Sequence, residues 1–166
     1  MFLPDYILNT YKDLTADFLV EHGINTLVLD IDNTLVPYEV ECPTKELYEW
    51  FSSIENKGIR IAFVSNNNRA RVELFNSELN YLAFYKSKKP LTITMKKVMS
   101  ELNGNPKSTA IMGDQIFTDV LAGKSMGFLT ILVPPIKDKT DLFTKFKRRL
   151  ERPCIKKYYK RLGENK

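Results

Sequence analysis

The chain has 166 residues, of which 43% are hydrophobic and 27% are charged, and its net charge is +5. This composition excludes a disordered or fibrous chain and predicts one globular domain over residues 1–166. No apolar run approaches the ~20 residues that span a bilayer, and we expect no signal peptide. The two cysteines, Cys42 and Cys154, are too few and too far apart for a metal cluster or a disulfide framework. We therefore expect a cytoplasmic protein.

Predicted strands and helices alternate along the chain. The N-terminal segment 1–23 has apolar residues at helical spacing over residues 1–20, and it either docks onto the core or lies on lipid. Beyond it, apolar periodicity with Gly and Pro punctuation predicts strands at 25–30, 59–65, 81–85, 108–114 and 128–135 and helices at 43–57, 69–79, 90–102 and 116–126. We expect a parallel sheet with helices on both faces, an α/β Rossmann-like fold whose core covers about 24–135.

The positive charge is concentrated in the C-terminal tail, residues 137–166. The tail has 12 Lys and Arg against 4 Asp and Glu, a balance of +8, whereas the rest of the chain has 13 against 16, a balance of −3. Its apolar residues include Phe143, Phe146, Leu150, Ile155, Tyr158 and Tyr159. The tail is either a solvated helical surface packed on or near the core, or a contact for a polyanion such as nucleic acid or an anionic membrane.

Small polar residues stand where predicted strands end. Asp30, Ser65 and Asp114 each occupy such a position. In parallel sheets the ligand site lies at the carboxyl ends of the strands. Helix caps and loops also use Asp and Ser at these places, so each position alone supports both interpretations.

The run DIDNT, residues 30–34, places two carboxylates on the same side of an extended segment. The carboxylates of Asp30 and Asp32 repel each other, and a hard divalent cation such as Mg²⁺ removes that penalty. The alternative is a structural turn and helix cap shaped by Asn33 and Thr34.

Gly113, Asp114 and Asp119 form a second acidic motif. Asp114 can add a third carboxylate to the same edge of the sheet. Alternatively, Asp114 caps the following helix, Asp119 lies on its solvated face, and Gly113 only eases the turn.

Two further segments can bind phosphate. The Ser65 hydroxyl and the N–H groups at Asn66 can hold a phosphate oxygen, or they form a polar loop that caps the next helix. A lysine before Pro90, either Lys88 or Lys89, can balance a phosphate and a nucleophilic carboxylate, or the cluster 86–89 is simply solvated.

Taken together, the order Asp-x-Asp-x-Thr, Ser, Lys-Pro and Gly-Asp-x-x-x-x-Asp resembles the haloacid dehalogenase-like (HAD) phosphohydrolase superfamily over residues 24–133. The segments DIDNTLV, VSNN, KKP and GDQIFTD are similar to the YqeG-like subgroup of the class III phosphatases, whose relatives include phosphatidylglycerophosphate phosphatases. The resemblance implies a Mg²⁺-dependent phosphomonoester hydrolase that forms an aspartyl-phosphate.

The resemblance also implies a role for each motif residue. Asp30 would be the nucleophile, and Asp32 would be the general acid and base. Mg²⁺ would bind the Asp30 carboxylate, the Asp32 main-chain carbonyl and Asp114. Asp119 would support the lysine or a metal-bound water, and Gly113 would be a supporting residue of the same motif. The residues that would bind the phosphoryl group are Thr34, Ser65, Asn66 and Lys89.

The segments after Thr34 and Ser65 are filled by ordinary predicted elements, so we expect no cap domain over the site. An uncapped site buries little of a small metabolite, which favours a large or lipid-borne phosphate. The resemblance makes phosphatidylglycerophosphate the first candidate substrate, met in peripheral contact with an anionic membrane. The alternatives are a soluble phosphomonoester such as a sugar phosphate or nucleotide, and a nucleic-acid-associated protein that uses the basic tail. The oligomeric state stays open.

Overall fold

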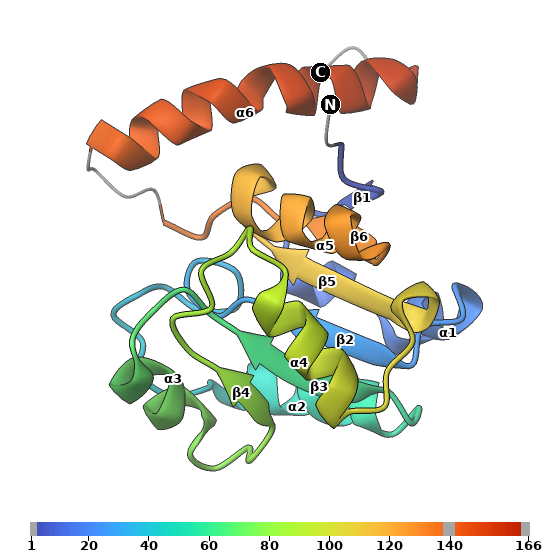
Figure 1. Cartoon of the computed structure of the whole chain (residues 1–166), viewed down its shortest axis with the longest axis vertical. Helices are drawn as coiled ribbons and strands as arrows, with labels where there is room; N and C mark the ends of the chain where they lie inside the picture. Colours follow the sequence, from blue (N-terminus) through green and yellow to red (C-terminus); the bar gives the residue numbers. More distant parts are fainter. Residues whose placement is uncertain (1–2, 138–141, 164–166) are drawn as a thin grey trace.

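In the computed structural model, residues 3–137 and 142–163 are described, with side chains for all of them except 142–148. The strands are β1 (Tyr6–Ile7), β2 (Thr26–Leu29), β3 (Arg60–Val64), β4 (Leu82–Phe84), β5 (Thr109–Gly113) and β6 (Leu129–Leu132). They form one sheet in the order β1-β6-β5-β2-β3-β4, and each neighbouring pair is parallel (Figure 1). This confirms the predicted parallel α/β fold.

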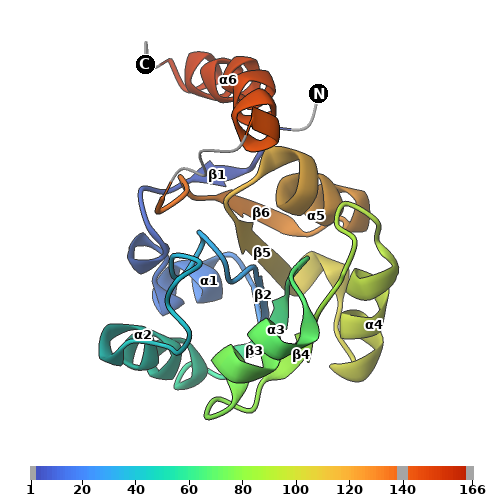
Figure 2. The same cartoon turned by 90° about the vertical axis from the view of Figure 1, so that its left-hand side faces the viewer.

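Helices cover both faces of the sheet (Figure 2). The helices are α1 (Ala16–Glu21), α2 (Lys45–Glu55), α3 (Arg69–Asn76), α4 (Ile93–Glu101), α5 (Leu121–Met126) and α6 (Leu142–Arg161), with short 3₁₀ turns η1 (Tyr11–Asp13) and η2 (Pro106–Ser108) and a π turn η3 (Ile116–Val120). Alternate residues of β2 serve the two faces: Leu27 and Leu29 join the cluster with α1 and α2, and Val28 joins the cluster with α4. The central strands β2, β3 and β5 are therefore apolar after their first residues, which are Thr26, Arg60 and Thr109, and polar side chains follow where these strands end.

The N-terminal segment does not form the helix that its spacing suggested. It runs as β1, η1 and α1, because β1 pairs with β6 at the edge of the sheet and the turns start at capping threonines. Leu14 and Leu19 are fully buried, and the indole Nε1 of Trp50 in α2 donates to the Leu14 carbonyl at 2.9 Å. This part of the chain thus packs on the core; Met1 and Phe2 lie outside the described residues.

Two predicted helices also differ from the structure. The helix expected from Pro90 begins only at Ile93, since residues 88–91 form a turn closed by the Leu91 amide and the Lys88 carbonyl at 2.9 Å. The helix expected over 116–126 begins as the π turn η3, where the Val120 amide donates to the Gln115 carbonyl. Such wide turns are frequent at functional sites.

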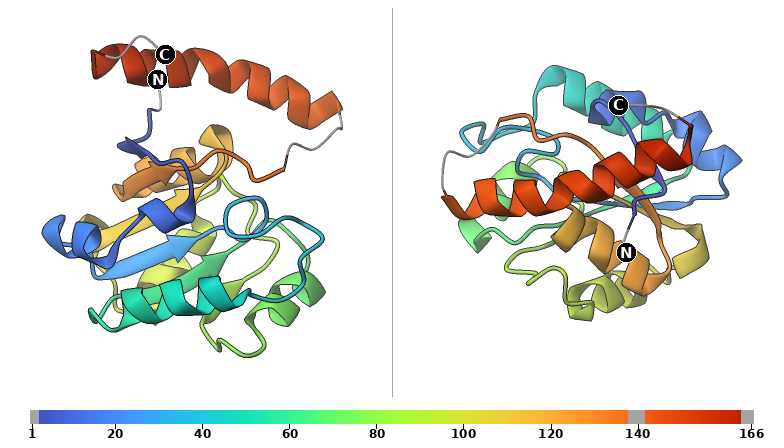
Figure 3. Two further views of the ribbon diagram at one scale, coloured as in Figure 1. Left: turned by 180° about the vertical axis from the view of Figure 1, so that it is seen from behind. Right: turned by 90° about the horizontal axis from the view of Figure 1, so that it is seen from above.

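The C-terminal helix α6 lies across the outside of the sheet beside its β1 edge (Figure 3). The Glu151 carboxylate accepts from the Ile116 amide at 2.8 Å, and the Tyr158 hydroxyl accepts from the Ile7 amide at 3.2 Å. These contacts join α6 to η3 and β1, while the side chains of Phe143 and Phe146, part of the predicted amphipathic tail, lie outside the described set. Within the described ranges, none of the helices combines the length and the apolar character needed to cross a membrane.

Candidate active site

The loop after β2 carries the first motif to the carboxyl edge of the sheet. Asp30 continues the β ladder, because its amide donates to the Met112 carbonyl at 3.0 Å. The chain then turns sharply: the Ile31 carbonyl accepts from the Leu35 amide at 2.9 Å, and Asn33 takes a left-handed φ of 64°. Asn tolerates this conformation better than most residues. The turn stops the strand and leaves the Asp30 side chain at its end.

Both oxygens of the Asp30 carboxylate have partners within the protein. The Lys89 ammonium donates to Oδ1 at 2.7 Å, and the Thr34 hydroxyl donates to Oδ2 at 3.2 Å. Thr34 is 1% exposed. Its hydroxyl therefore fixes the direction of the Asp30 carboxylate.

Lys89 is the centre of the buried charge network. Its Nζ lies 2.7 Å from Asp30 Oδ1, 2.7 Å from Asp119 Oδ1 and 2.6 Å from the Val64 carbonyl oxygen. Burial lowers the pKa of Lys89, but Asp119 and Asp30 outweigh it and hold the pKa above its ordinary value. The lysine is therefore a permanent cation between two carboxylates.

The lysine loop is held in place by Asn66. Its Oδ1 accepts from the Ser87 hydroxyl at 2.7 Å and from the Lys89 amide at 2.8 Å, and its Nδ2 donates to the Lys89 carbonyl at 3.3 Å. The Asn66 side chain is thus committed to the loop. Of the two candidate lysines, Lys89 is buried beside Asp30, and Lys88 is exposed.

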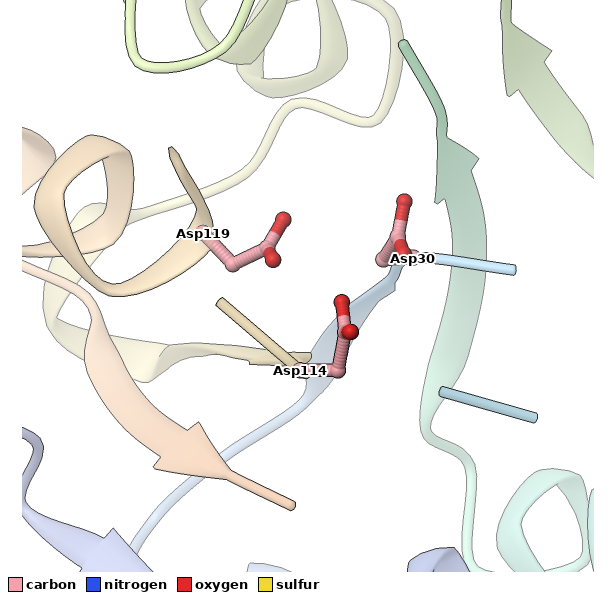
Figure 4. A group of neighbouring side chains, drawn as sticks. All are labelled: Asp30, Asp114 and Asp119. Atoms are coloured by element: carbon pink, nitrogen blue, oxygen red, sulfur yellow. The ribbon is translucent and has the colours of Figure 1, made fainter. Parts of the chain in front are cut away.

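Three buried carboxylates converge beside this lysine: Asp30 from the end of β2, Asp114 from the end of β5, and Asp119 from η3 (Figure 4). One oxygen of each lies within 4.8 Å of the others. Burial raises the pKa of Asp30 to about 7, helped by the carboxylates of Asp119 and Asp114 and opposed by Lys89. A buried set of hard oxygen donors that repel one another fits a divalent cation.

Gly113 makes the approach of Asp119 possible. A Cβ built on Gly113 would lie 2.2 Å from the Asp119 Cγ, far inside van der Waals contact. The Asp119 Oδ2 also accepts from the Gln115 amide and the Thr118 hydroxyl, each at 3.2 Å. The glycine and the π turn together place this carboxylate over the end of β5.

Asp32 has different surroundings from the three converging carboxylates. Its Oδ1 accepts from Arg71 Nε at 3.0 Å, and its Oδ2 accepts from Asn67 Nδ2 at 2.8 Å. Arg71 also donates to the Glu41 carbonyl at 3.1 Å. The sequence did not single out either Arg71 or Asn67 as a partner of Asp32. Arg71 lies in the first turn of α3, where an arginine is usually solvated, so the sequence carried no signal for this pairing.

A cavity of about 260 Å³ opens between these groups. Asp30, Asp32, Ser65, Lys89 and Asp119 line it. The Ser65 Oγ accepts from the Asn67 amide at 3.1 Å. The structure thus brings the ends of β2 and β3, the lysine loop and η3 to one polar cavity that is large enough for a phosphoryl group.

No inserted domain covers this cavity within residues 3–137: residues 35–44 form the connection to α2, and residues 66–88 contain α3 and β4.

The chain is similar in sequence to known proteins. Residues 1–137 match the family described as mitochondrial PGP phosphatase. The chain is 35% identical over 154 residues to the probable phosphatase YqeG of Bacillus subtilis, which covers 93% of this chain and 90% of that protein. It is 25% identical over 172 residues to phosphatidylglycerophosphate phosphatase 1, chloroplastic/mitochondrial, of Arabidopsis thaliana, covering 96% of this chain but only 49% of that protein.

Solved structures agree on the fold. The cobalt-bound deoxy-D-mannose-octulosonate 8-phosphate phosphatase of Haemophilus influenzae aligns with a TM-score of 0.55 at 13% identity, over 76% of this chain and 75% of that one. The family match over most of the chain and the YqeG relative together establish that this chain belongs to the PGP phosphatase family and is a phosphoric monoester hydrolase.

Proposed function

We propose that the protein hydrolyses phosphomonoesters with the help of Mg²⁺, through a phosphorylated Asp30. The observation that carries this proposal is the fixed orientation of the Asp30 carboxylate, which lines a polar cavity. One of its oxygens accepts a hydrogen bond from Lys89 and the other accepts one from Thr34. The carboxylates of Asp30 and Asp114 and the main-chain carbonyl of Asp32 would hold Mg²⁺, which neutralises the crowded carboxylates and the phosphoryl oxygens.

In the first half of the reaction, an oxygen of Asp30 attacks phosphorus as the bond from phosphorus to the leaving oxygen breaks. Asp32 gives its proton to that oxygen, so the alcohol leaves neutral. Lys89 and the Ser65 hydroxyl hold the phosphoryl oxygens in line. The Thr34 hydroxyl orients the nucleophile, since it already donates to Asp30.

In the second half, water attacks the phosphorus of the aspartyl-phosphate and gives a proton to Asp32. The bond between Asp30 and phosphorus breaks, inorganic phosphate leaves, and both aspartates return to their starting states. Asp119 keeps Lys89 directed at Asp30 throughout, because it binds the same ammonium at 2.7 Å.

The test is hydrolysis of 4-nitrophenyl phosphate with Mg²⁺ or with EDTA. Asp30→Asn should abolish turnover, and wild-type protein quenched in acid should carry a phosphoryl group on the peptide that contains Asp30. Asp17→Asn is the matched control, since Asp17 is an exposed partner of Lys57 outside the site. Turnover by the Asp30 variant, or equal rates in EDTA, would reject the mechanism.

For the substrate, we propose a lipid-borne phosphomonoester such as phosphatidylglycerophosphate, met at a membrane surface. The family description and the name of the Arabidopsis relative support this choice, and the uncapped cavity leaves room for a large leaving group. The test is a panel of phosphatidylglycerophosphate, phosphatidic acid, sugar phosphates and nucleotides. A higher kcat/KM for a sugar phosphate or a nucleotide than for any lipid would replace this proposal by the soluble alternative.

A further inference from the structure

A surface groove of about 540 Å³ adjoins the catalytic cavity on the outer side of the lysine loop. It lies between β4 and the start of α4, at the carboxyl edge that faces the viewer in Figure 2. Three lysines and no carboxylate line it: Lys86, Lys88 and Lys97. The charged residues that line the groove are therefore all positive, and the groove lies beside a strongly acidic catalytic site.

The same groove exposes large apolar side chains. Tyr85 is 41% exposed, Leu91 is 53% exposed, and Ile93, in the first turn of α4, is 64% exposed. Ile136, 48% exposed, follows β6 at this edge, where its amide donates to the Asn33 carbonyl at 3.1 Å. Apolar side chains thus stand on two sides of the catalytic opening. Apolar side chains among lysines on one face are typical of surfaces that bind anionic lipid.

The loop between the cavity and the groove alternates its side chains. Lys89 is buried and lines the catalytic cavity, Ser87 is buried and donates to Asn66, and Lys86 and Lys88 are exposed and line the groove. Lys86 and Lys88 have φ values of 45° and 56°, a conformation that costs roughly 1 kcal/mol for such residues. The contacts of Asn66 with this loop offset that cost. A held loop therefore connects the phosphoryl pocket directly to the cationic groove.

We propose that this docking face, formed by Tyr85, Lys86, Lys88, Leu91, Ile93 and Lys97, binds the surface of an anionic bilayer and presents the catalytic opening to a phosphomonoester in that bilayer. The lysines pair with lipid phosphates, and the apolar side chains enter the boundary of the acyl layer. This inference rests on the proposed function, and it selects the membrane as the source of the substrate.

The basic tail is the competing surface. Lys156, Lys157, Lys160 and Arg161 line an apolar depression near the end of α6. Figure 1 shows that α6 starts above the carboxyl edge and ends on the opposite side of the molecule. A bilayer held at that end of α6 would not face Asp30, whereas the docking face lies next to the catalytic opening.

Two double variants test the docking face. Lys86→Asn with Lys97→Gln removes two charges, and Asn tolerates the left-handed backbone at position 86. Leu91→Ser with Ile93→Ser removes the exposed apolar groups. The matched control is Lys156→Gln with Lys160→Gln on α6. Far-UV circular dichroism checks that each variant is folded.

The first measurement is co-sedimentation with vesicles of phosphatidylcholine, with or without phosphatidylglycerol. We expect binding only to the anionic vesicles, with about thirtyfold weaker partitioning after loss of two lysines, from about 1 kcal/mol for each. The Leu91 and Ile93 variant should bind at least tenfold more weakly. The α6 control should bind like the wild type. Wild-type affinity in both docking-face variants, or loss only in the α6 control, would overturn the proposal.

The second measurement compares hydrolysis of 4-nitrophenyl phosphate with hydrolysis of vesicle-borne phosphatidylglycerophosphate. The docking-face variants should hydrolyse 4-nitrophenyl phosphate at the wild-type rate. Their rate on vesicle-borne phosphatidylglycerophosphate should be at least tenfold lower than that of the wild type. Equal rates on the vesicle-borne substrate would also overturn the proposal. If the wild type hydrolysed no phosphomonoester, the proposed function would fail, while sedimentation would still decide whether this face binds lipid.

Discussion

The crowding of Asp30, Asp114 and Asp119 should make the stability of the metal-free protein fall as the pH rises. The pKa of Asp30 is raised from 3.8 to about 7, first by burial and then by the two neighbouring carboxylates. The folded state therefore binds the Asp30 proton more tightly than the unfolded state does. Between these two pKa values the folded state holds more protons, so raising the pH favours unfolding.

The size of this effect follows from the same two pKa values. A difference from 3.8 to about 7 corresponds to about 4 kcal/mol of unfolding free energy, at about 1.4 kcal/mol for each pH unit. The loss should be complete slightly above pH 7 and absent near pH 4. Because Mg²⁺ competes with the proton for these oxygens, it should restore stability at pH 8 and have little effect at pH 5.

Urea denaturation at pH 5, 6, 7 and 8, in EDTA or in Mg²⁺, measures this dependence. Other groups also titrate in this range, so the informative quantity is the difference between the wild type and Asp30→Asn at each pH. In EDTA the wild type should lose stability relative to this variant as the pH rises, and Mg²⁺ should remove the trend. A flat difference in EDTA, or equal Mg²⁺ stabilisation of both proteins at pH 8, would refute the reasoning.

Three further substitutions follow from single contacts. Gly113→Ala places a methyl group 2.2 Å from Asp119 Cγ, so it should cost about 1–3 kcal/mol in urea denaturation and weaken Mg²⁺ binding measured by calorimetry. Arg71→Met removes the guanidinium that holds Asp32, so kcat should fall at least tenfold more for an alkyl phosphate than for 4-nitrophenyl phosphate, whose leaving group needs no proton. Trp50→Phe loses a buried hydrogen bond and should cost about 1–3 kcal/mol without changing kcat.

Arg69, the first residue of α3, provides a matched control for the Arg71 prediction. Arg69→Met removes an exposed arginine that pairs with Glu73 within α3, and it should leave both rates unchanged. Equal losses on the two substrates in the Arg71 variant would mean that Arg71 maintains the structure without directing Asp32. The same result in Asp32→Asn would instead argue against Asp32 as the acid.

Much of the fold was accessible from the sequence because the buried parallel strands are mainly apolar and the central ones are followed by polar residues. The strand β2, which is followed by Asp30, and the helix capped by Thr44 follow such local rules. The strand β1 was missed, since two residues carry no periodicity and their pairing with β6 depends on a partner more than 120 residues away. The turn η3 was missed because its apolar pattern fits an ordinary helix equally well.

The sequence predicted which residues form the candidate site and their order along the chain. It did not predict which of these side chains contact each other. The sequence places Asp119 five residues after Asp114, yet only the π turn and the bare Cα of Gly113 bring its carboxylate to Lys89. Arg71 could not be assigned to Asp32, because an arginine in the first turn of a helix is usually solvated. Its partner is set by how α3 crosses the sheet edge, which is a tertiary property.

The charges of the site explain why Asp32 needs a separate partner. Asp30, Asp114 and Asp119 together with Lys89 amount to three negative charges and one positive charge, a balance of −2. One divalent cation brings that group to neutrality before a phosphate dianion arrives. Once Asp32 has given its proton to the leaving group, its carboxylate would add a fourth uncompensated negative charge beside the phosphoryl group, and Arg71 compensates that charge from α3 at 3.0 Å. The arginine therefore lets a second aspartate stand two residues from the nucleophile without adding to the charge that one cation must offset.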